Sequence, residues 1–148
     1  MSLMVDAAPL VAFMDRADSQ HEAVAQLLRN EPGPLVLPAP VSAEVDYLAR
    51  RRLGRRAREA FFADLADGKF EMASLDSGDY ELLRDYDQRY ADLDVGLADL
   101  SLVILARRYR TRRVLSFDRR HFEALRPLDG GWFTILPGPP TRRRRRRQ

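Results

Sequence analysis

Two short apolar runs near opposite ends of the chain each finish in an aspartate, and this feature most constrains the fold. Asp6 follows the run Leu3–Val5, and Asp118 follows the run Val114–Phe117. Short apolar runs of this kind are typical of buried strands in a parallel sheet. The carboxyl ends of parallel strands meet along one edge of the sheet, where ligands bind in open α/β folds. The two aspartates are therefore predicted to lie close together at that edge.

Two further acids open apolar helices that are expected over residues 42–53 and 97–109. Glu44 is predicted to lie on the buried face of the first helix, with Asp46 pointing outward, and Asp99 lies in the first turn of the second. Each acid alone could simply cap a helix or complement its dipole. Crowded carboxylates, however, raise one another's pKa and persist mainly where a cation holds them. The sequence therefore predicts a divalent-metal site, and a metal held by acids suggests phosphate chemistry. The four predicted ligands are Asp6, Glu44, Asp99 and Asp118.

Apolar runs and amphipathic stretches alternate along the chain. Strands are expected over residues 3–5, 35–37, 70–73, 114–117 and 132–136, with helices between them, and a capping box at Ser19–Glu22 predicts one helix start. This alternation predicts an α/β fold with a mostly parallel central sheet and helices on both faces. A single domain is expected over residues 1–137, followed by a disordered basic tail, rich in proline and arginine, over residues 138–148.

Composition narrows the classes of function. The 148 residues, 45% of them hydrophobic, suffice for one domain with its own core. The absence of cysteine excludes thiol catalysis and fits a cytoplasmic location, and no apolar run approaches the roughly 20 residues that cross a bilayer. The formal net charge is +3, but Arg142–Arg147 supply six positive charges, so the preceding residues carry −3. The domain itself is therefore mildly acidic.

Arginines form two clusters within this acidic domain. They could be solvated helix ends, because arginine favours helix C-termini. They could equally contact nucleic-acid phosphates beside the acidic site, and the sequence leaves both interpretations open. The same question applies to the tail, which could add RNA affinity or have no role. The first cluster comprises Arg50, Arg51, Arg52, Arg55, Arg56 and Arg58, and the second comprises Arg107, Arg108, Arg110, Arg112 and Arg113.

Four segments together resemble the motifs of PIN-domain ribonucleases. They are Val5-Asp6, the helix start Ser42–Leu48, the segment Gly96–Val103, and Leu115–Phe122 with its Asp-Arg-Arg-His-Phe sequence. The similarity is greatest to the VapC toxins of bacterial toxin–antitoxin modules, and it covers residues 3–137. It implies a PIN-like three-layer α/β/α fold and RNA cleavage that depends on Mg²⁺ or Mn²⁺ and leaves a 3′-hydroxyl and a 5′-phosphate.

The resemblance also implies partners and residue roles. A homodimer is expected, together with a VapB-type antitoxin that neutralises it in a hetero-oligomer. The antitoxin's C-terminal helix is predicted to lie against the helices over residues 42–66 and to reach the acids with a basic residue. The substrate would be transfer RNA or ribosomal RNA, and nothing in the sequence chooses between them. The residues implied to bind metal and carry catalysis are Asp6, Glu44, Asp99 and Asp118.

One departure from the family pattern concerns the position after the first aspartate. The family commonly has Thr or Ser there, whereas Ala7 and Ala8 follow Asp6 in this chain. Ser116 could supply a hydroxyl behind the metal ligands instead. His121 is expected to orient the helix after Asp118 rather than to bind metal.

Two alternative functions remain open on the sequence alone. The missing hydroxyl after Asp6 keeps open a weakly active RNA-binding module that works mainly through its antitoxin complex. A phosphoacceptor receiver domain also gathers acids at strand ends, but it is disfavoured because its strand-end lysine has no counterpart. The only lysine in this chain is Lys69, which lies elsewhere.

Overall fold

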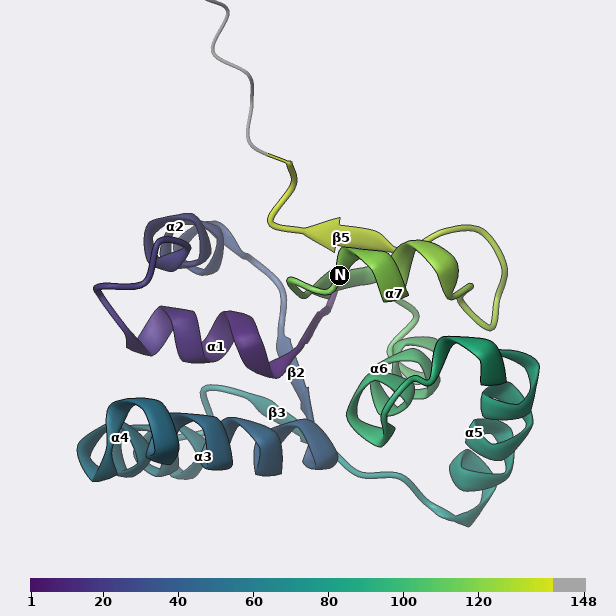
Figure 1. Ribbon diagram of the computed structural model, residues 1–148, viewed down its shortest axis with the longest axis horizontal. Coiled ribbons are helices and arrows are strands. Elements are labelled where there is room, and N and C mark those ends of the chain that lie inside the picture. Colours follow the sequence, from purple (N-terminus) through teal and green to yellow (C-terminus); the bar gives the residue numbers. More distant parts are fainter. Residues whose placement is uncertain (140–148) are drawn as a thin grey trace, which may run out of the picture.

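The computed structural model of the protein describes residues 1–139. The arginines at 142–147, and the tail prediction that rests on them, lie outside the described residues. Strands and helices alternate as the sequence predicts (Figure 1). The elements are β1 (Leu3–Val5), α1 (Ala7–Met14), α2 (His21–Asn30), β2 (Leu35–Pro38), α3 (Ala39–Leu53), α4 (Arg55–Ala66), β3 (Glu71–Ala73), α5 (Ser77–Arg89), the 3₁₀ turn η1 (Ala91–Leu93), α6 (Leu97–Arg108), β4 (Arg113–Leu115), α7 (Arg119–Ala124) and β5 (Thr134–Leu136).

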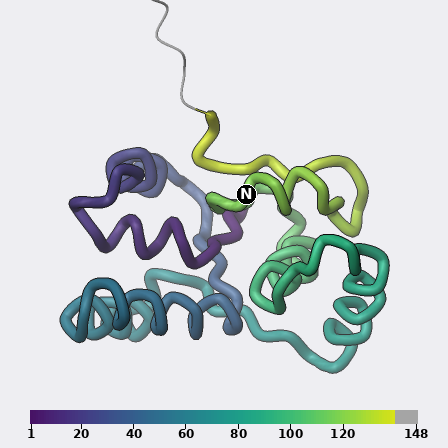
Figure 2. The backbone as a smooth tube through the Cα atoms, viewed as in Figure 1, coloured from purple at the N-terminus to yellow at the C-terminus, as the bar shows by residue number. Residues whose placement is uncertain are grey.

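The five strands form one sheet in the order β3-β2-β1-β4-β5, and every neighbouring pair is parallel. The predicted α/β class is confirmed. The chain moves outward from β1 through β2 to β3, then returns to place β4 and β5 on the other side of β1. Figure 2 shows the purple start of the chain beside the green segment of β4, and Met4 pairs with Val114. The strand order therefore reverses between β1 and β4, which is where ligands bind in such sheets.

Helices cover both faces of the sheet and complete the predicted three layers. Crossovers between parallel strands are right-handed, so connections that run in opposite directions along the sheet lie on opposite faces. In Figure 1, α1–α4 lie on one side of the central strands and α5–α7 lie on the other. The helix α3 packs against both α1 and α4, and α5 packs against α6.

The core forms around the central strand and the most apolar helix. All three residues of β1 are fully buried, and so are Leu102, Val103 and Leu105 of α6. A strand with neighbours on both edges and helices on both faces has no exposed side, which explains why its sequence is continuously apolar. Within the described residues, no helix is long and apolar enough to cross a membrane.

Several local predictions are wrong in detail. The helix α2 begins after Gln20, whose side chain makes no capping hydrogen bond, so the predicted capping box at Ser19 does not form. A complete capping box occurs instead at the start of α5, between Asp76 and Asp79. The helix α3 starts at Ala39 rather than residue 42, with a proline in its first turn, where the missing N–H costs nothing.

Candidate active site

Asp6 and Asp118 follow neighbouring strands, and Ser116 links them. Asp6 caps α1, where the N–H of Ala7 donates to its Oδ1 over 2.8 Å. The hydroxyl of Ser116 donates to Asp6 Oδ2 over 2.8 Å, and the N–H of Asp118 donates to Ser116 Oγ over 3.0 Å. Asp6 and Ser116 are almost entirely buried. This chain of hydrogen bonds fixes the carboxylate of Asp6 at the point where the strand order reverses.

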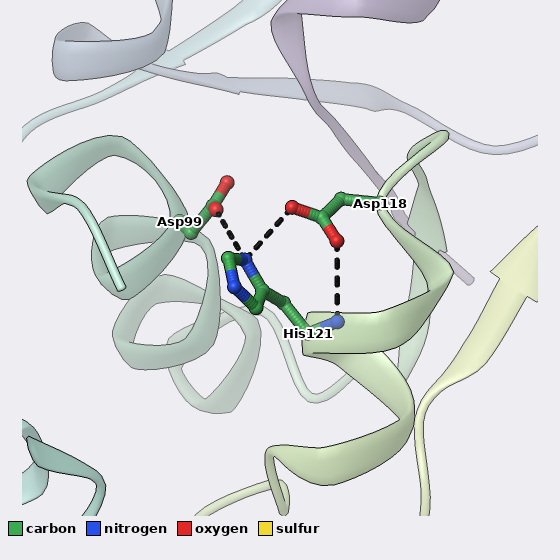
Figure 3. Close-up of side chains that lie close together, drawn as sticks. All are labelled: Asp99, Asp118 and His121. Carbon is green, nitrogen blue, oxygen red and sulfur yellow. Dashed lines mark hydrogen bonds and ion pairs between the residues drawn. The ribbon is translucent and has the colours of Figure 1, made fainter. Parts of the chain in front are cut away.

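Asp99 and Asp118 face each other across His121 (Figure 3). Asp118 caps α7 by accepting the N–H of His121 over 3.2 Å. The Nδ1 atom of His121 lies 2.8 Å from Asp118 Oδ2 and 3.6 Å from Asp99 Oδ2. Despite these short distances, this buried nitrogen makes no hydrogen bond of good direction. One ligand atom from each residue lies within 4.8 Å of the others, so the three residues could hold a metal ion.

Glu44 reaches the same site from a different position than predicted. It is exposed rather than buried, whereas the supposedly outward Asp46 is half-buried and pairs with Arg58 over 2.6 Å. The buried stripe of α3 consists of Val41, Val45 and Ala49, which leaves Glu44 on its flank. Partial burial raises the pKa of Glu44, and so does the nearby carboxylate of Asp6. Glu44 therefore contributes its charge to the site from the rim.

The carboxylates at this edge raise one another's pKa. Burial and then the carboxylates of Asp6, Asp118 and Glu44 together raise the pKa of Asp99 to about 7, against the lowering effect of His121. Burial also raises the pKa of Asp6, against the lowering effect of its hydrogen bonds with Ser116 and Ala7. The site therefore concentrates negative charge, which His121 offsets in part at Asp99.

His121 is the residue whose position sequence reasoning underestimated. Its backbone does serve the start of α7, as expected, but its ring also lies between two of the four acids. The available signal was its spacing, because a side chain three residues after an N-cap lies over that cap. Asp94, the acid just before the loop into α6, is exposed, has a left-handed conformation after η1, and does not belong to the group of residues that could hold a metal ion.

The comparisons with known proteins agree with this geometry. The PIN domain family profile matches residues 3–126. Ribonuclease VapC26 from Mycobacterium tuberculosis is 40% identical over 135 residues, which represent 91% of this chain and 100% of that protein. The chain belongs to the PIN domain family. Among PIN domains, its similarity over nearly the whole chain places it with the VapC ribonucleases.

Solved structures show the same PIN fold at low sequence identity. The M. tuberculosis toxin VapC20, described as cleaving the sarcin–ricin loop, has a TM-score of 0.73 at 20% identity and covers 79% of this chain and 90% of its own. Rickettsia felis VapBC2, bound to a promoter DNA fragment, has a TM-score of 0.65 at 14% identity, covering 91% and 98%. FitAcB from Neisseria gonorrhoeae has a TM-score of 0.63 at 18% identity, covering 89% and 96%. The predicted PIN-like architecture is confirmed.

Proposed function

We propose that this PIN-domain protein is a metal-dependent endoribonuclease toxin of a VapBC-type module, which hydrolyses RNA phosphodiester bonds and inhibits growth. The observation that carries the proposal is the crowding around Asp99, whose pKa is raised to about 7 by burial and by neighbouring carboxylates. Such crowding is unfavourable unless a cation relieves it. The relative with 40% identity is named a ribonuclease, which supports the same reaction class.

The residues present fit a hard divalent cation. Asp6, Glu44, Asp99 and Asp118 offer carboxylate oxygens, the ligands that Mg²⁺ and Mn²⁺ prefer. We assign these four residues to metal binding and catalysis. A bound Mg²⁺ or Mn²⁺ would stabilise charge on the phosphate and lower the pKa of an attacking water. Imidazole is a poor ligand for Mg²⁺, so His121 is assigned as a charge partner of Asp99 and Asp118 rather than as a ligand.

The other groups of the site hold these carboxylates in place. Ser116 presents its hydroxyl to Asp6 and accepts the N–H of Asp118, so it orients two acids at once. Second partners of this kind fix the direction of metal ligands and tune their basicity. Because Ser116 gives Asp6 a hydroxyl donor despite Ala7 and Ala8, we favour an active nuclease over the weakly active RNA-binding module.

The proposal is tested by mapping the 5′ ends of RNA after incubation with the purified protein. We expect new ends at defined positions in transfer RNA or ribosomal RNA with Mg²⁺ or Mn²⁺, and none with EDTA. The fragments should carry 5′-phosphates, which make them substrates for a 5′-phosphate-dependent exonuclease. Cleavage that continues in EDTA, or 5′-hydroxyl ends, would contradict the proposed mechanism.

We further propose that a VapB-type antitoxin segment binds as a helix between α1 and α4, one helix away from the placement against α3 and α4 that was predicted over residues 42–66. An apolar hollow of about 210 Å³ lies there, lined by Leu10, Phe13, Phe61 and Phe70 among others. Phe13, which lines the hollow, is 40% exposed, and Phe62, next to Phe61 in α4, is 44% exposed. Exposed aromatic residues beside such a hollow are typical of helix-binding grooves. The segment would extend toward the acids and offer them a basic side chain.

This placement is tested by replacing Phe13 with Asp, which should abolish antitoxin binding without affecting RNA cleavage, because Phe13 lies outside the acid site. Replacing exposed Tyr80 of α5 with Asp serves as the matched control and should leave antitoxin binding unchanged. If the two variants lost antitoxin binding equally, the groove would be misplaced. A homodimer remains part of the proposal, and light scattering of the isolated protein measures it directly.

A further inference from the structure

The amino edge of the sheet, opposite the acids, contains a cavity of about 670 Å³. It is bordered by the start of the chain, the end of α6, the α6–β4 turn and the loop before β5. A volume of this size is in the range of small-ligand pockets. With strands of only three residues, about 10 Å of sheet separates this edge from the acidic one. The cavity is thus a separate place from the proposed catalytic site.

The cavity is lined by four arginines of the second cluster. They are Arg107, Arg110, Arg112 and Arg113. This corrects the suggestion that the cluster lies beside the acidic site, because α6 begins at the acidic edge and carries the chain to the other edge. Asp129 is the only acid in the lining. The lining therefore carries a clear excess of positive charge, in contrast to the acidic domain around it.

Three of these arginines are held by specific contacts. Arg113 makes two hydrogen bonds to Glu31, and Arg107 lies 3.7 Å from Asp129. The guanidinium of Arg112 donates to the carbonyl of Asp129 over 3.4 Å. It also lies against Gly131, where any Cβ would come within 2.7 Å of Arg112 Nη1. Gly131 has a φ of 79°, so both its conformation and its missing side chain accommodate Arg112.

Arg110 occupies a backbone position that favours glycine. The end of α6 is a Schellman motif, in which Thr111 N donates to Ala106 O and Arg110 N donates to Arg107 O. Arg110 is its left-handed residue, with a φ of 50°. An L-residue other than glycine costs roughly 1 kcal/mol in this conformation. The strain places a long cationic side chain at the cavity, and such strained positions concentrate at functional sites.

Arg110 and Arg112 have no carboxylate partner among residues 1–139, whereas Arg107 and Arg113 are each paired. Two guanidiniums without a carboxylate partner at one cavity are suited to a terminal phosphate, which carries close to two negative charges and accepts several hydrogen bonds. The remaining wall is apolar, formed by Val103, Ala106 and Leu128 among others. We propose that this cavity binds a phosphorylated small molecule of nucleotide size, with the phosphate at Arg110 and Arg112.

The position of the cavity favours a small ligand over the RNA substrate. A strand engaged with the acids would have to continue around the sheet to reach the opposite edge. An internal phosphodiester of RNA would also bring only one negative charge to two guanidiniums that have no carboxylate partner, so it matches them less well than a terminal phosphate does. The inference does not rest on the proposed nuclease activity, since no residue of the cavity belongs to the acid site.

Binding is measured on the full-length protein by isothermal titration calorimetry with adenosine, AMP, ADP and inorganic phosphate. All titrations contain EDTA, so that nucleotides cannot bind through a metal ion at the acids. Trp132, the only tryptophan of the chain, lies in the loop before β5 and offers a second readout by fluorescence. We expect AMP or ADP to bind and adenosine to bind at least about tenfold more weakly, because a charged hydrogen bond contributes about 1.5–3 kcal/mol.

Two variants test the assignment to specific residues. Arg110→Gly removes one guanidinium and also relieves the positive φ, so it should fold at least as stably while binding AMP about tenfold more weakly. Arg112→Ala should weaken binding by a similar factor. The matched control is Arg56→Ala, an exposed arginine of α4, and Asp99→Asn controls for binding at the acids; both should bind as the wild type does. Every variant retains Arg142–Arg147, so the tail cannot account for a difference.

The proposal is overturned if no phosphorylated ligand binds at millimolar concentration, or if adenosine binds as tightly as AMP. It is also overturned if Arg110→Gly, shown to be folded by a melting temperature at or above that of the wild type, binds AMP with wild-type affinity. If Arg110→Gly and Arg112→Ala reduce only RNA affinity, the surface is an RNA contact and the small-ligand proposal is wrong. None of these results depends on whether the protein cleaves RNA.

Discussion

The two edges of the sheet contain buried carboxylates in opposite electrostatic situations. At the amino edge, the side chain of Glu31 is 3% exposed and accepts two hydrogen bonds from Arg113, of 2.8 and 2.5 Å, and one from the N–H of Gly33. Arg113 and Gly33 thereby lower the pKa of Glu31. At the carboxyl edge, burial and neighbouring acids raise the pKa of Asp99 to about 7.

This contrast separates a structural acid, Glu31, from the acids assigned to the proposed active site. Glu31 has its cation built into the chain, and the pair joins the segment before β2 to the start of β4. The acids at the other edge repel each other, an arrangement that costs stability and is retained at sites where a ligand compensates. The direction of a carboxylate's pKa shift thus distinguishes a structural ion pair, such as Glu31–Arg113, from a candidate binding site within one small domain.

The largest expected effect comes from Asp99→Asn. The isosteric amide keeps the shape but removes a ligand charge, so RNA cleavage should fall by about a hundredfold or more. Stability without metal should rise, because repulsion decreases. Cleavage rates and thermal melting measure the two effects, with Asp92→Asn, an exposed acid of η1, as the matched control. Full cleavage by Asp99→Asn would show that the acids at the carboxyl edge are not the active site.

The next largest effect concerns the free energy of unfolding and the Glu31–Arg113 pair at the amino edge. Arg113→Ala leaves the nearly inaccessible side chain of Glu31 without its cation, and leaving such an acceptor unpaired in this partly buried pair costs about 1–3 kcal/mol. Unfolding in urea should show this loss, and adding Glu31→Gln should restore part of it. Arg29→Ala, which breaks an exposed pair with Glu22, should cost less than about 1 kcal/mol. If Arg113→Ala and Arg29→Ala lost equal amounts of unfolding free energy, the Glu31 pair would be no more important for stability than an exposed pair.

A smaller effect is expected for Ser116→Ala. The variant loses the donor to Asp6 and the acceptor for the N–H of Asp118. Partners of metal ligands typically contribute 10–100-fold, and we expect about a tenfold loss in metal affinity and cleavage. Ser101→Ala, which removes another buried hydroxyl, one that donates to Ala98 O, controls for stability alone. A wild-type metal affinity in Ser116→Ala would show that Asp6 needs no such support.

The smallest effect is a difference in pH dependence between the two edges, measured without metal. The folded pKa of Asp99 is above its unfolded value, so ionising it costs stability. This cost appears as a decrease in the free energy of unfolding, and so as a downward slope, as pH rises from about 4 to about 7. The pKa of Glu31 is lowered on folding, so its stabilisation is present above the unfolded value of 4.5 and is lost as pH falls further. Urea unfolding across pH should lose the first slope in Asp99→Asn and the second in Glu31→Gln.

Much of this architecture could be predicted because it is encoded locally. Apolar runs identified four of the strands and an alternating pattern identified the fifth, over residues 70–73. The expectation that Asp6 and Asp118 lie at one edge of the sheet followed from their positions at strand ends, and the structure adds that the two strands are neighbours. The face of α3 was assigned wrongly because Asp46 is half-buried by Arg58, a residue of α4. The ring of His121 was misjudged for the same reason, since its neighbour Asp99 belongs to α6. Contacts between helices leave no periodic signal in either sequence.

The ion pair between Glu31 and Arg113 at the amino edge is a contact that the sequence does not predict. Glu31 and Arg113 are 82 residues apart, and each resembles an ordinary helix-end or surface residue, so no local pattern in the sequence pairs them. Arg113 was assigned only to a cluster of cationic residues, and the structure divides that cluster into paired and unpaired members. The sequence shows how many arginines the cluster has, but not which of them have a carboxylate partner.

The strand order has a consequence for the protein during its synthesis. The central strand β1 emerges from the ribosome first, but its partner β4 is about 110 residues later in the chain. Asp6 therefore acquires its neighbours Ser116 and Asp118 only when almost the entire domain has been translated. A nascent or truncated chain that ends before β4 contains three of the four acids but has no strand to bring the fourth beside them. The active arrangement is thus expected to form in the last step of folding, after the groove between α1 and α4 has been synthesised.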